Sequence, residues 1–233
     1  MNIKRILGKC RRGLDVVTLN AYASYSQAGE DRIVSYLLNQ LGISKPTYLD
    51  IGANEPVISN NTYMFYDRGG KGVCIEPDPE MFRKIKKARP RDTALNVGIG
   101  LTNAPGMSFY LFPGKENGWS TFSEKEAKLR EAESGIKYKV ITVPVRNIND
   151  IIAENFTSAP DFISLDVEGM DLEILQSLDF QRFQPEIICV ETITFSITNT
   201  EEKLDEISAF MHSKGYYTYG DTHVNTIFCR KTS

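Results

Sequence analysis

Acidic side chains follow two short apolar runs in the first third of this sequence. Asp50 lies at the end of one run and is followed by Gly52 and Asn54, and Glu76 ends the next run, GVCIE. An acidic residue in this place can accept hydrogen bonds from both hydroxyls of a ribose, and a glycine lets the backbone approach a ligand closely. The spacing is typical of a nucleoside site, although two ordinary strand-end carboxylates explain Asp50 and Glu76 equally well.

The sequence lacks the loop motifs that cradle phosphates. Gly52 begins no GxGxxG motif, and no GxxxxGK[ST] motif is present. Because both motifs bind phosphate groups, a nucleoside without a pyrophosphate, such as S-adenosylmethionine, fits better, and its positive sulfonium suits an acidic rim of Asp50, Asp166 and Glu168. The same absence argues against a nicotinamide-dependent dehydrogenase. A non-catalytic nucleoside-binding module is a further alternative, against which the stability cost of an unused acidic cluster argues.

A second group of carboxylates follows two later apolar runs. Asp166 and Glu168 are two residues apart, so in an extended chain they point to the same side and repel each other unless a cation lies close. Both are candidate catalytic residues. Asp166 together with Glu191, which ends the next run, can offer the hard oxygen ligands that Mg²⁺ or Mn²⁺ prefers. His223, in the turn DTHVN, is a candidate base or substrate contact, and a plain turn residue is the competing interpretation.

The elements that must position these side chains alternate between strand-like and helix-like runs, which favours an α/β fold with a mainly parallel sheet. The strand-like runs cover residues 48–51, 72–76, 94–100, 108–112, 139–145, 161–167, 186–192, 216–222 and 225–231. Helical spacing covers residues 33–41, 79–85, 123–133, 148–152, 172–178 and 200–214. The last two strands are too close for a parallel crossover, so we expect them to be antiparallel neighbours. Ligands of such sheets bind outside the carboxyl ends of the strands, where the carboxylates lie.

One of these helices is unusually polar. Ser123 and Glu126 match a capping box at its start, but almost no apolar stripe follows. We therefore expect an exposed insertion, with a lid over the site as the functional alternative. Trp119, the single tryptophan, lies in the loop before this helix and either stacks on a ligand or packs within its loop.

Composition narrows the classes of protein. The 233 residues, 41% hydrophobic and 24% charged with a net charge of −3, fit one large domain or two small ones, and the charge argues against a nucleic-acid partner. No apolar run approaches ~18 residues, so we expect no membrane span. Cys74 and Cys189 lie in apolar runs and are expected to be reduced core thiols, which favours a cytoplasmic location.

The chain also divides by charge. Residues 1–25 form a basic arm, for which a disordered or dimer-forming role is favoured over contact with an anionic membrane or a partner enzyme. A homo-oligomer is therefore left open. Residues 26–233 are expected to form a single domain.

Six segments together resemble a known family. They are SQAGEDRIV (26–34), YLDIGANEPVISNNTYMFY (48–66), GVCIEPDPEMF (72–82), LNVGIG (95–100), DFISLDVEGMDLEIL (161–175) and PEIICVET (185–192). Each motif alone is weakly specific, but their combination is similar to the FkbM family of S-adenosylmethionine-dependent O-methyltransferases over roughly residues 24–230. The resemblance implies a class I (Rossmann-like) methyltransferase fold, with a seven-stranded, mostly parallel sheet and a C-terminal antiparallel hairpin.

The resemblance also implies residues around the cofactor. They are Ser26, Gln27 and Glu30 on the N-terminal side, Asp50, Gly52 and Asn54 at the methionine part, Asp166 in the acidic rim, Glu76 at the ribose, and Asn96 and Val97 beside the adenine. From the residues alone, Ser26 is equally well explained as a helix cap. Glu55 departs from some relatives, which carry histidine there, so substrate specificity is expected to differ if this position touches substrate.

The implied reaction is methyl transfer to a sugar hydroxyl. The acceptor expected from the resemblance is a nucleotide sugar or a precursor of a surface or capsular polysaccharide. The expected partner is therefore a small sugar or nucleotide sugar rather than a nucleic acid.

Overall fold

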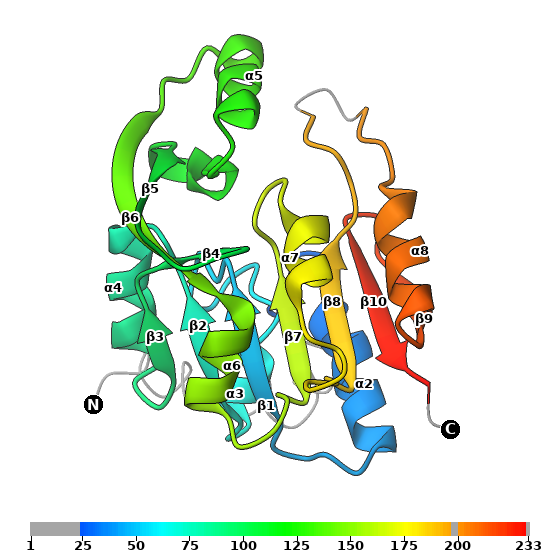
Figure 1. The fold of residues 1–233 in the computed structure, drawn as a ribbon. Helices are drawn as coiled ribbons and strands as arrows, with labels where there is room; N and C mark the ends of the chain where they lie inside the picture. The colour runs from blue at the N-terminus through cyan, green and yellow to red at the C-terminus, as the bar shows by residue number, and fades with distance from the viewer. Residues whose placement is uncertain (1–23, 197–199, 232–233) are drawn as a thin grey trace, which may run out of the picture.

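The protein has a central seven-stranded sheet and a smaller three-stranded sheet (Figure 1). The structure, a computed structural model, describes residues 24–196 and 200–231, so the basic arm expected over residues 1–25 lies almost entirely outside the described residues. The strands are β1 (Thr47–Ile51), β2 (Lys71–Ile75), β3 (Thr93–Leu95), β4 (Gly98–Gly100), β5 (Ala104–Leu111), β6 (Lys139–Asn147), β7 (Phe162–Leu165), β8 (Ile187–Glu191), β9 (Tyr216–Asp221) and β10 (Asn225–Arg230). The helices are α2 (Glu30–Gln40), α3 (Tyr63–Asp67), α4 (Pro79–Ala88), the 3₁₀ helix η2 (Gly114–Trp119), α5 (Glu124–Ser134), α6 (Ile148–Asn155), α7 (Asp171–Ser177) and α8 (Asp205–Ser213).

The large sheet has the order β3-β2-β1-β7-β8-β10-β9. Its strands pair in parallel except β10, which is antiparallel to both β8 and β9. The seven-stranded, mostly parallel fold with a C-terminal antiparallel hairpin is therefore confirmed. Strand order reverses between β1 and β7, and a reversal of this kind is where ligands of open α/β sheets bind.

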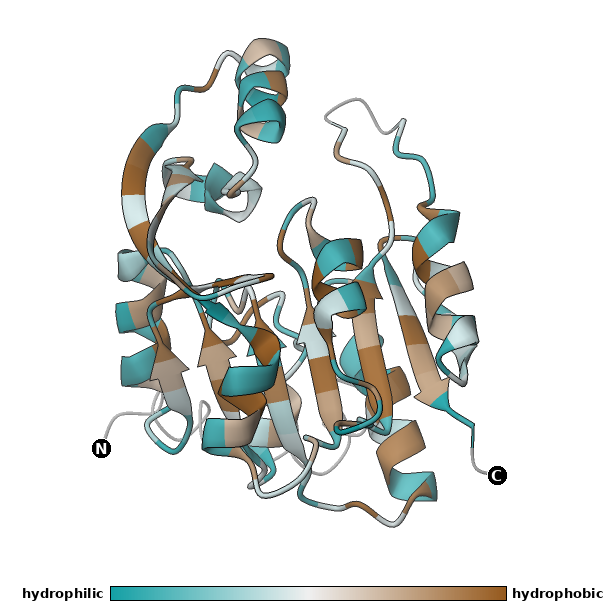
Figure 2. Cartoon of the chain, viewed as in Figure 1, coloured by the Kyte–Doolittle hydropathy of each residue, from teal (hydrophilic) through white to brown (hydrophobic). Residues whose placement is uncertain are grey.

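Both faces of this sheet are buried because its apolar residues continue through the pleat. Leu49 and Ile51 of β1 pack in one core with α6, α7 and α8. Tyr48 packs on the other face with α2 and α3, and Figure 2 shows the central strands mainly in brown. Asp50, which alternates with Leu49 and Ile51, therefore points to the Tyr48 face.

The strand predicted over residues 94–100 is wrong as a single element. The chain forms β3 in the large sheet and β4 in the small one, and Asn96 lies between them. The side-chain amide of Asn96 donates to the backbone oxygens of Glu76 and Pro77 at 2.8 and 3.0 Å. These two bonds hold the chain at the end of β2, so it leaves the large sheet there.

The small sheet has the order β4-β6-β5 and rises beside the carboxyl ends of the large sheet, with α5 beyond it (Figure 1). The polar helix expected over 123–133 corresponds to α5. Ser123 caps it, since its hydroxyl accepts from the backbone N–H of Glu126 at 3.2 Å. The insertion therefore places η2 and α5 on the side of the sheet where ligands are expected.

The last predicted helix begins later than expected. Residues 200–204 precede α8, and Lys203 forms an isolated bridge with Ile193.

Cys74 and Cys189 are buried and free, as expected. Within the described ranges, no helix combines the length and the hydropathy needed to cross a membrane.

Candidate active site

A cavity of about 420 Å³ lies at the carboxyl ends of β1, β2, β7 and β8. Its floor is formed by residues that follow these strands, among them Asp50, Glu76, Asp166 and Glu191. Its other walls come from η2, from the residues around Phe109 and Phe122, and from the segment 193–196. The insertion and the large sheet thus enclose the cavity together, at the reversal of strand order.

Asp50 is held by contacts that all go to one of its oxygens. Its Oδ2 accepts from the Thr62 hydroxyl at 2.6 Å and the Asn60 amide at 3.2 Å, and it lies 3.4 Å from Nη1 of Arg89. Burial raises the pKa of Asp50, and the Arg89 charge acts in the opposite direction. Among the described residues, Oδ1 of Asp50 has no such contact, and Asp50 lines the cavity.

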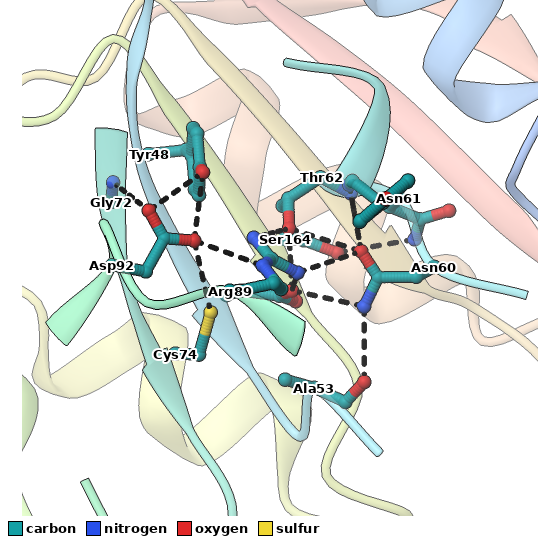
Figure 3. Close-up of polar contacts among 12 residues, drawn as sticks. Tyr48, Ala53, Asn60, Asn61, Thr62, Gly72, Cys74, Arg89, Asp92 and Ser164 are labelled. Carbon is teal, nitrogen blue, oxygen red and sulfur yellow. Dashed lines mark hydrogen bonds and ion pairs between the residues drawn. The ribbon is translucent and has the colours of Figure 1, made fainter. Parts of the chain in front are cut away.

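Arg89 is the centre of a polar network on the Tyr48 face (Figure 3). Its side chain is 0% exposed, and its Nε donates to Asp92 at 2.9 Å. Asp92 also accepts from the Tyr48 hydroxyl and from the backbone N–H of Gly72. One buried guanidinium therefore lies between the two carboxylates of Asp50 and Asp92.

Gly52 is required by the close approach of β1 to β7. Its φ is +76°, and a Cβ built on it would lie 1.8 Å from the backbone oxygen of Asp166. The next turn holds Asn54, whose side-chain oxygen accepts from the Asn117 amide at 2.7 Å. This contact joins the loop after β1 to η2 of the insertion.

Glu76 is buried at the end of β2, with 5% of its surface exposed. Its two carboxylate oxygens accept the backbone N–H groups of Asn54 and Asp78, each at 2.7 Å. Burial raises the pKa of Glu76 to about 8, against the effect of these two hydrogen bonds. The carboxylate is thus fixed in the cavity wall beside the loop that contains Gly52.

Asp166, Glu168 and Glu191 form a carboxylate cluster on the opposite side of the reversal. One oxygen from each lies within 4.8 Å of the others. Burial raises the pKa of Asp166 to about 6, although the Arg130 charge lowers it, and burial with repulsion from Asp166 raises the pKa of Glu168 to about 8. Burial and the neighbouring carboxylates also raise the pKa of Glu191 well above its usual value.

Only part of this cluster has a cationic partner. Nη2 of Arg130 lies 2.9 Å from Glu168. Oδ1 of Asp166 is buried and has no hydrogen-bond partner among the described residues. Since buried acceptors are nearly always satisfied in folded proteins, this oxygen marks where a ligand group would bind.

The turn DVEG sets the direction of Glu168. Glu168 has a φ of +59°, which is uncommon for a residue with a side chain. Its backbone oxygen accepts from the Thr121 hydroxyl at 2.9 Å, and Asp171 accepts from the backbone N–H groups of Val167 and Gly169. Asp171 therefore stabilises the turn.

Arg130 corrects the expectation that the polar helix is only an exposed insertion. Its side chain is 2% exposed, its Nη1 donates to the Trp119 oxygen at 2.6 Å, and its guanidinium lies 4.5 Å from the centre of the Phe195 ring. Ala127, three residues earlier, is also buried. One side of α5 therefore packs against residues that line the cavity, and the three-residue spacing of Ala127 and Arg130 is the signal that could have identified it.

The structure places the other predicted residues as follows. Gln27 lines the cavity, but Ser26 and Glu30 do not. The Ser26 hydroxyl accepts from the backbone N–H groups of Gly29 and Asp31, although the N-cap residue of α2 is Gly29 and not Ser26. The buried Glu30 accepts from Thr222 and Asn225, so it joins the start of α2 to the last hairpin.

Three further predicted residues also lie outside the cavity lining. Asn96 holds the turn after β3 and Val97 packs against the core, and neither lines the cavity. His223 is exposed in the β9–β10 turn with a φ of +75°, and its backbone N–H donates to Asp221. Glu55 pairs with Lys84 at 3.1 Å and does not line the cavity either.

Solved structures similar to this one include several methyltransferases. An FkbM methyltransferase from Methylobacillus flagellatus matches at 15% identity and a TM-score of 0.47, over 80% of this chain and 44% of that chain. A TehB-like SAM-dependent methyltransferase from Corynebacterium glutamicum matches at 11% identity and a TM-score of 0.43, over 99% and 100%. A magnesium protoporphyrin IX methyltransferase from Synechocystis, solved with bound SAH, matches at 8% identity and a TM-score of 0.47, over 87% and 81%.

The chain spans less than half the length of that Methylobacillus protein. No curated protein matches the sequence. The model of the methyltransferase FkbM domain matches residues 50–217, which contain every floor residue of the cavity named above. The chain therefore belongs to the FkbM methyltransferase family.

Proposed function

We propose that the protein transfers a methyl group from S-adenosylmethionine to a sugar hydroxyl. The observation that carries this proposal is the position of Glu76 and Asp50 at the ends of two neighbouring strands, in one cavity at the reversal of strand order. Membership of the FkbM family supports the same reaction class.

The residues present fit S-adenosylmethionine. Glu76 would accept the ribose hydroxyls, because a fixed acidic side chain at the end of the second strand can bind both. Asp50 lines the cavity, and the Arg89 network contacts only its Oδ2. Its Oδ1 would accept a hydrogen bond from the ammonium group of the methionine part. Gly52 keeps the floor free of a side chain between them.

Methyl transfer needs an aligned hydroxyl and a group to take its proton. When bound, S-adenosylmethionine supplies an electrophilic methyl group on its sulfonium. Oδ1 of Asp166 is the candidate base, because it is buried, without a partner among the described residues and part of the cavity lining. Its pKa of about 6 lies near the operating pH, where a general base is most effective. Glu168 would lie beside this base, fixed by its ion pair with Arg130.

A second version of the proposal adds a divalent cation at Asp166 and Glu191. Their oxygens and one from Glu168 lie within 4.8 Å of one another, and Mg²⁺ or Mn²⁺ prefers such oxygen ligands. When bound there, the cation would make an acceptor hydroxyl more acidic. Loss of methyl transfer with a chelator, restored by Mg²⁺ or Mn²⁺, would favour this version, whereas unchanged activity would favour Asp166 alone.

The sugar acceptor is supported by the walls of the cavity. Trp119, Phe109 and Phe122 also line it, and aromatic rings offer apolar surface to a ligand whose other edge is polar. The free thiols of the described cysteines are compatible with a cytoplasmic protein that acts on a surface or capsular polysaccharide precursor.

Binding of S-adenosylhomocysteine tests the proposal most directly. Calorimetry with the full chain is expected to show saturable binding, weakened about 10- to 100-fold by Glu76→Gln because one of the two oxygens that would accept the ribose hydroxyls becomes an amide donor. Glu80→Gln, an exposed change four residues along, is the matched control. No binding by the wild type would sink the proposal, NADH binding in its place would favour the dehydrogenase, and binding without methyl transfer to any glycan would favour the non-catalytic module.

A further inference from the structure

The charged side chains that line the cavity are all acidic. They are Asp50, Glu76, Asp78, Asp166, Glu168, Glu191 and Glu201. Among the described residues, no lysine, arginine or histidine belongs to the lining. Every ionisable side chain that a ligand contacts in this lining is therefore a carboxyl group.

The two arginines closest to the cavity act from behind its walls. Arg89 is buried between Asp50 and Asp92. Arg130 pairs with Glu168 at 2.9 Å and lies 4.0 Å from Glu126. In the part of the chain that the structure describes, Asp166, Glu191 and Glu201 form no ion pair within 4.0 Å.

Backbone N–H groups, which bind anions in other proteins, already have acceptors at two of the strand ends. At the start of α4, the N–H groups of Asp78 and Glu80 donate to Glu76 and Asp78. In the turn before α7, the N–H groups of Val167 and Gly169 donate to Asp171. Phosphates are recognised by arginine, lysine or free backbone N–H groups, and these four N–H groups already have acceptors within the protein.

We propose that the acceptor enters this cavity through a group that carries no phosphate or carboxylate, so that the substrate is a neutral or amine-bearing sugar and not a nucleotide sugar. This inference rests on the proposed function, of which it specifies the acceptor class. An anionic group in this cavity would find no cationic side chain among the described lining residues, and those carboxylates that are ionised would repel it because the effective dielectric is low. Trp119 and Phe195, whose rings meet edge to face at 5.3 Å beside the cluster, supply the apolar surface for such a sugar.

The fluorescence of one side chain can report the electrostatic potential of the cavity. Trp119 is the only tryptophan of the sequence and lines the cavity. Its fluorescence can be quenched with iodide, caesium and neutral acrylamide on the full chain loaded with S-adenosylhomocysteine, each value normalised to free N-acetyltryptophanamide. We expect caesium to quench several-fold more effectively than iodide at low salt, and the ratio to fall as salt screens the carboxylates. Iodide quenching equal to or above that of caesium would overturn the proposal.

Two variants show whether the carboxylates are the cause. Asp166→Asn combined with Glu201→Gln removes two carboxyl groups of the lining and is expected to bring the two quenching values together. Glu133→Gln removes one charge from the exposed side of α5 and is expected to leave the ratio as in the wild type. If the caesium-to-iodide quenching ratio stayed unchanged in the cavity variant but changed with Glu133→Gln, the lining would not set the electrostatic potential of the cavity.

Methyl transfer separates this inference from the proposed function. The panel contains methyl glucoside, glucosamine, glucose 1-phosphate and UDP-glucose, each with and without added Mg²⁺. Transfer to UDP-glucose or glucose 1-phosphate with a kcat/KM equal to that of the neutral sugar would overturn the inference and leave the methyltransferase standing. A preference of about 10-fold or more for the uncharged or amine-bearing sugar supports it. If no sugar of the panel is methylated, the quenching ratio alone decides whether the inference stands. Failure to bind S-adenosylhomocysteine would count against the proposed function and not against the inference.

Discussion

Two groups of carboxylates lie at the same edge of the sheet, and the protein compensates them differently. Asp50 has a buried guanidinium, a hydroxyl and an amide on one of its oxygens. The cluster of Asp166, Glu168 and Glu191 has one guanidinium for three carboxylates, and one buried oxygen without a partner among the described residues. The charge of Asp50 is therefore compensated within the protein, whereas the cluster has more carboxylates than cationic partners.

This difference separates stability from function. Removing one partner of a buried ion pair leaves an uncompensated charge, so the Asp50 side should be sensitive to mutation. Crowded carboxylates repel each other, so loss of a charge from the cluster should relieve the fold while it harms the reaction. Strained or unsatisfied groups of this kind are retained where they serve a ligand.

The largest expected effect is on the compensated side. Arg89→Met should lower the free energy of unfolding by about 3–5 kcal/mol, because Asp50 and Asp92 then remain buried without their shared cation. Urea denaturation measures the loss. Arg83→Met, an exposed change on the same helix, is the control and should stay within about 0.5 kcal/mol.

Asp50→Asn in the Arg89→Met chain should return part of this stability, because it removes one of the two stranded charges. A loss below about 1 kcal/mol for Arg89→Met alone would show that the network does not compensate Asp50.

The next effect is on the uncompensated side and concerns rate. Asp166→Asn should lower kcat by about 10²- to 10⁴-fold, the range for loss of a general base, with folding stability unchanged or higher. Methyl transfer from labelled S-adenosylmethionine gives the rate, and urea denaturation gives the stability. Full activity in this variant would remove Asp166 from the site.

The last expected effect, the smallest when taken per pH unit, is a dependence of stability on pH. The pKa of Glu168 is raised from 4.5 to about 8 by burial and by Asp166, so the folded protein binds a proton more tightly than the unfolded chain. Stability should therefore fall as pH rises between about 4.5 and 8, by up to about 1.4 kcal/mol per pH unit for one proton.

Glu168→Gln should flatten this slope, and Glu133→Gln should not. Stability that instead rises across the same interval would mean that Arg130 lowers the pKa of Glu168 more than burial raises it.

Much of this architecture is visible in the sequence because it depends on local patterns. Short apolar runs that end in Asp50, Glu76, Asp166 and Glu191 identify the strands and their functional ends. The break of the strand predicted over 94–100 was missed because it depends on hydrogen bonds from Asn96 to a different strand end.

The two buried arginines were missed for a related reason. Arg89 follows the exposed Lys86 and Lys87 and resembles them in type, although it continues the buried positions Met81 and Ile85 at four-residue intervals. Arg130 lies on a helix whose composition indicates an exposed surface. Only the tertiary structure shows which charges face inward.

The contact between Gly52 and the Asp166 oxygen has a consequence for how such a site can diverge. The floor is set by two backbones in contact, so it tolerates no side chain and cannot be widened by point mutation. The roof consists of side chains on an insertion joined to that floor by the Asn54–Asn117 amide pair. New acceptor preferences can therefore evolve by exchange of roof residues, while the cofactor half is inherited unchanged.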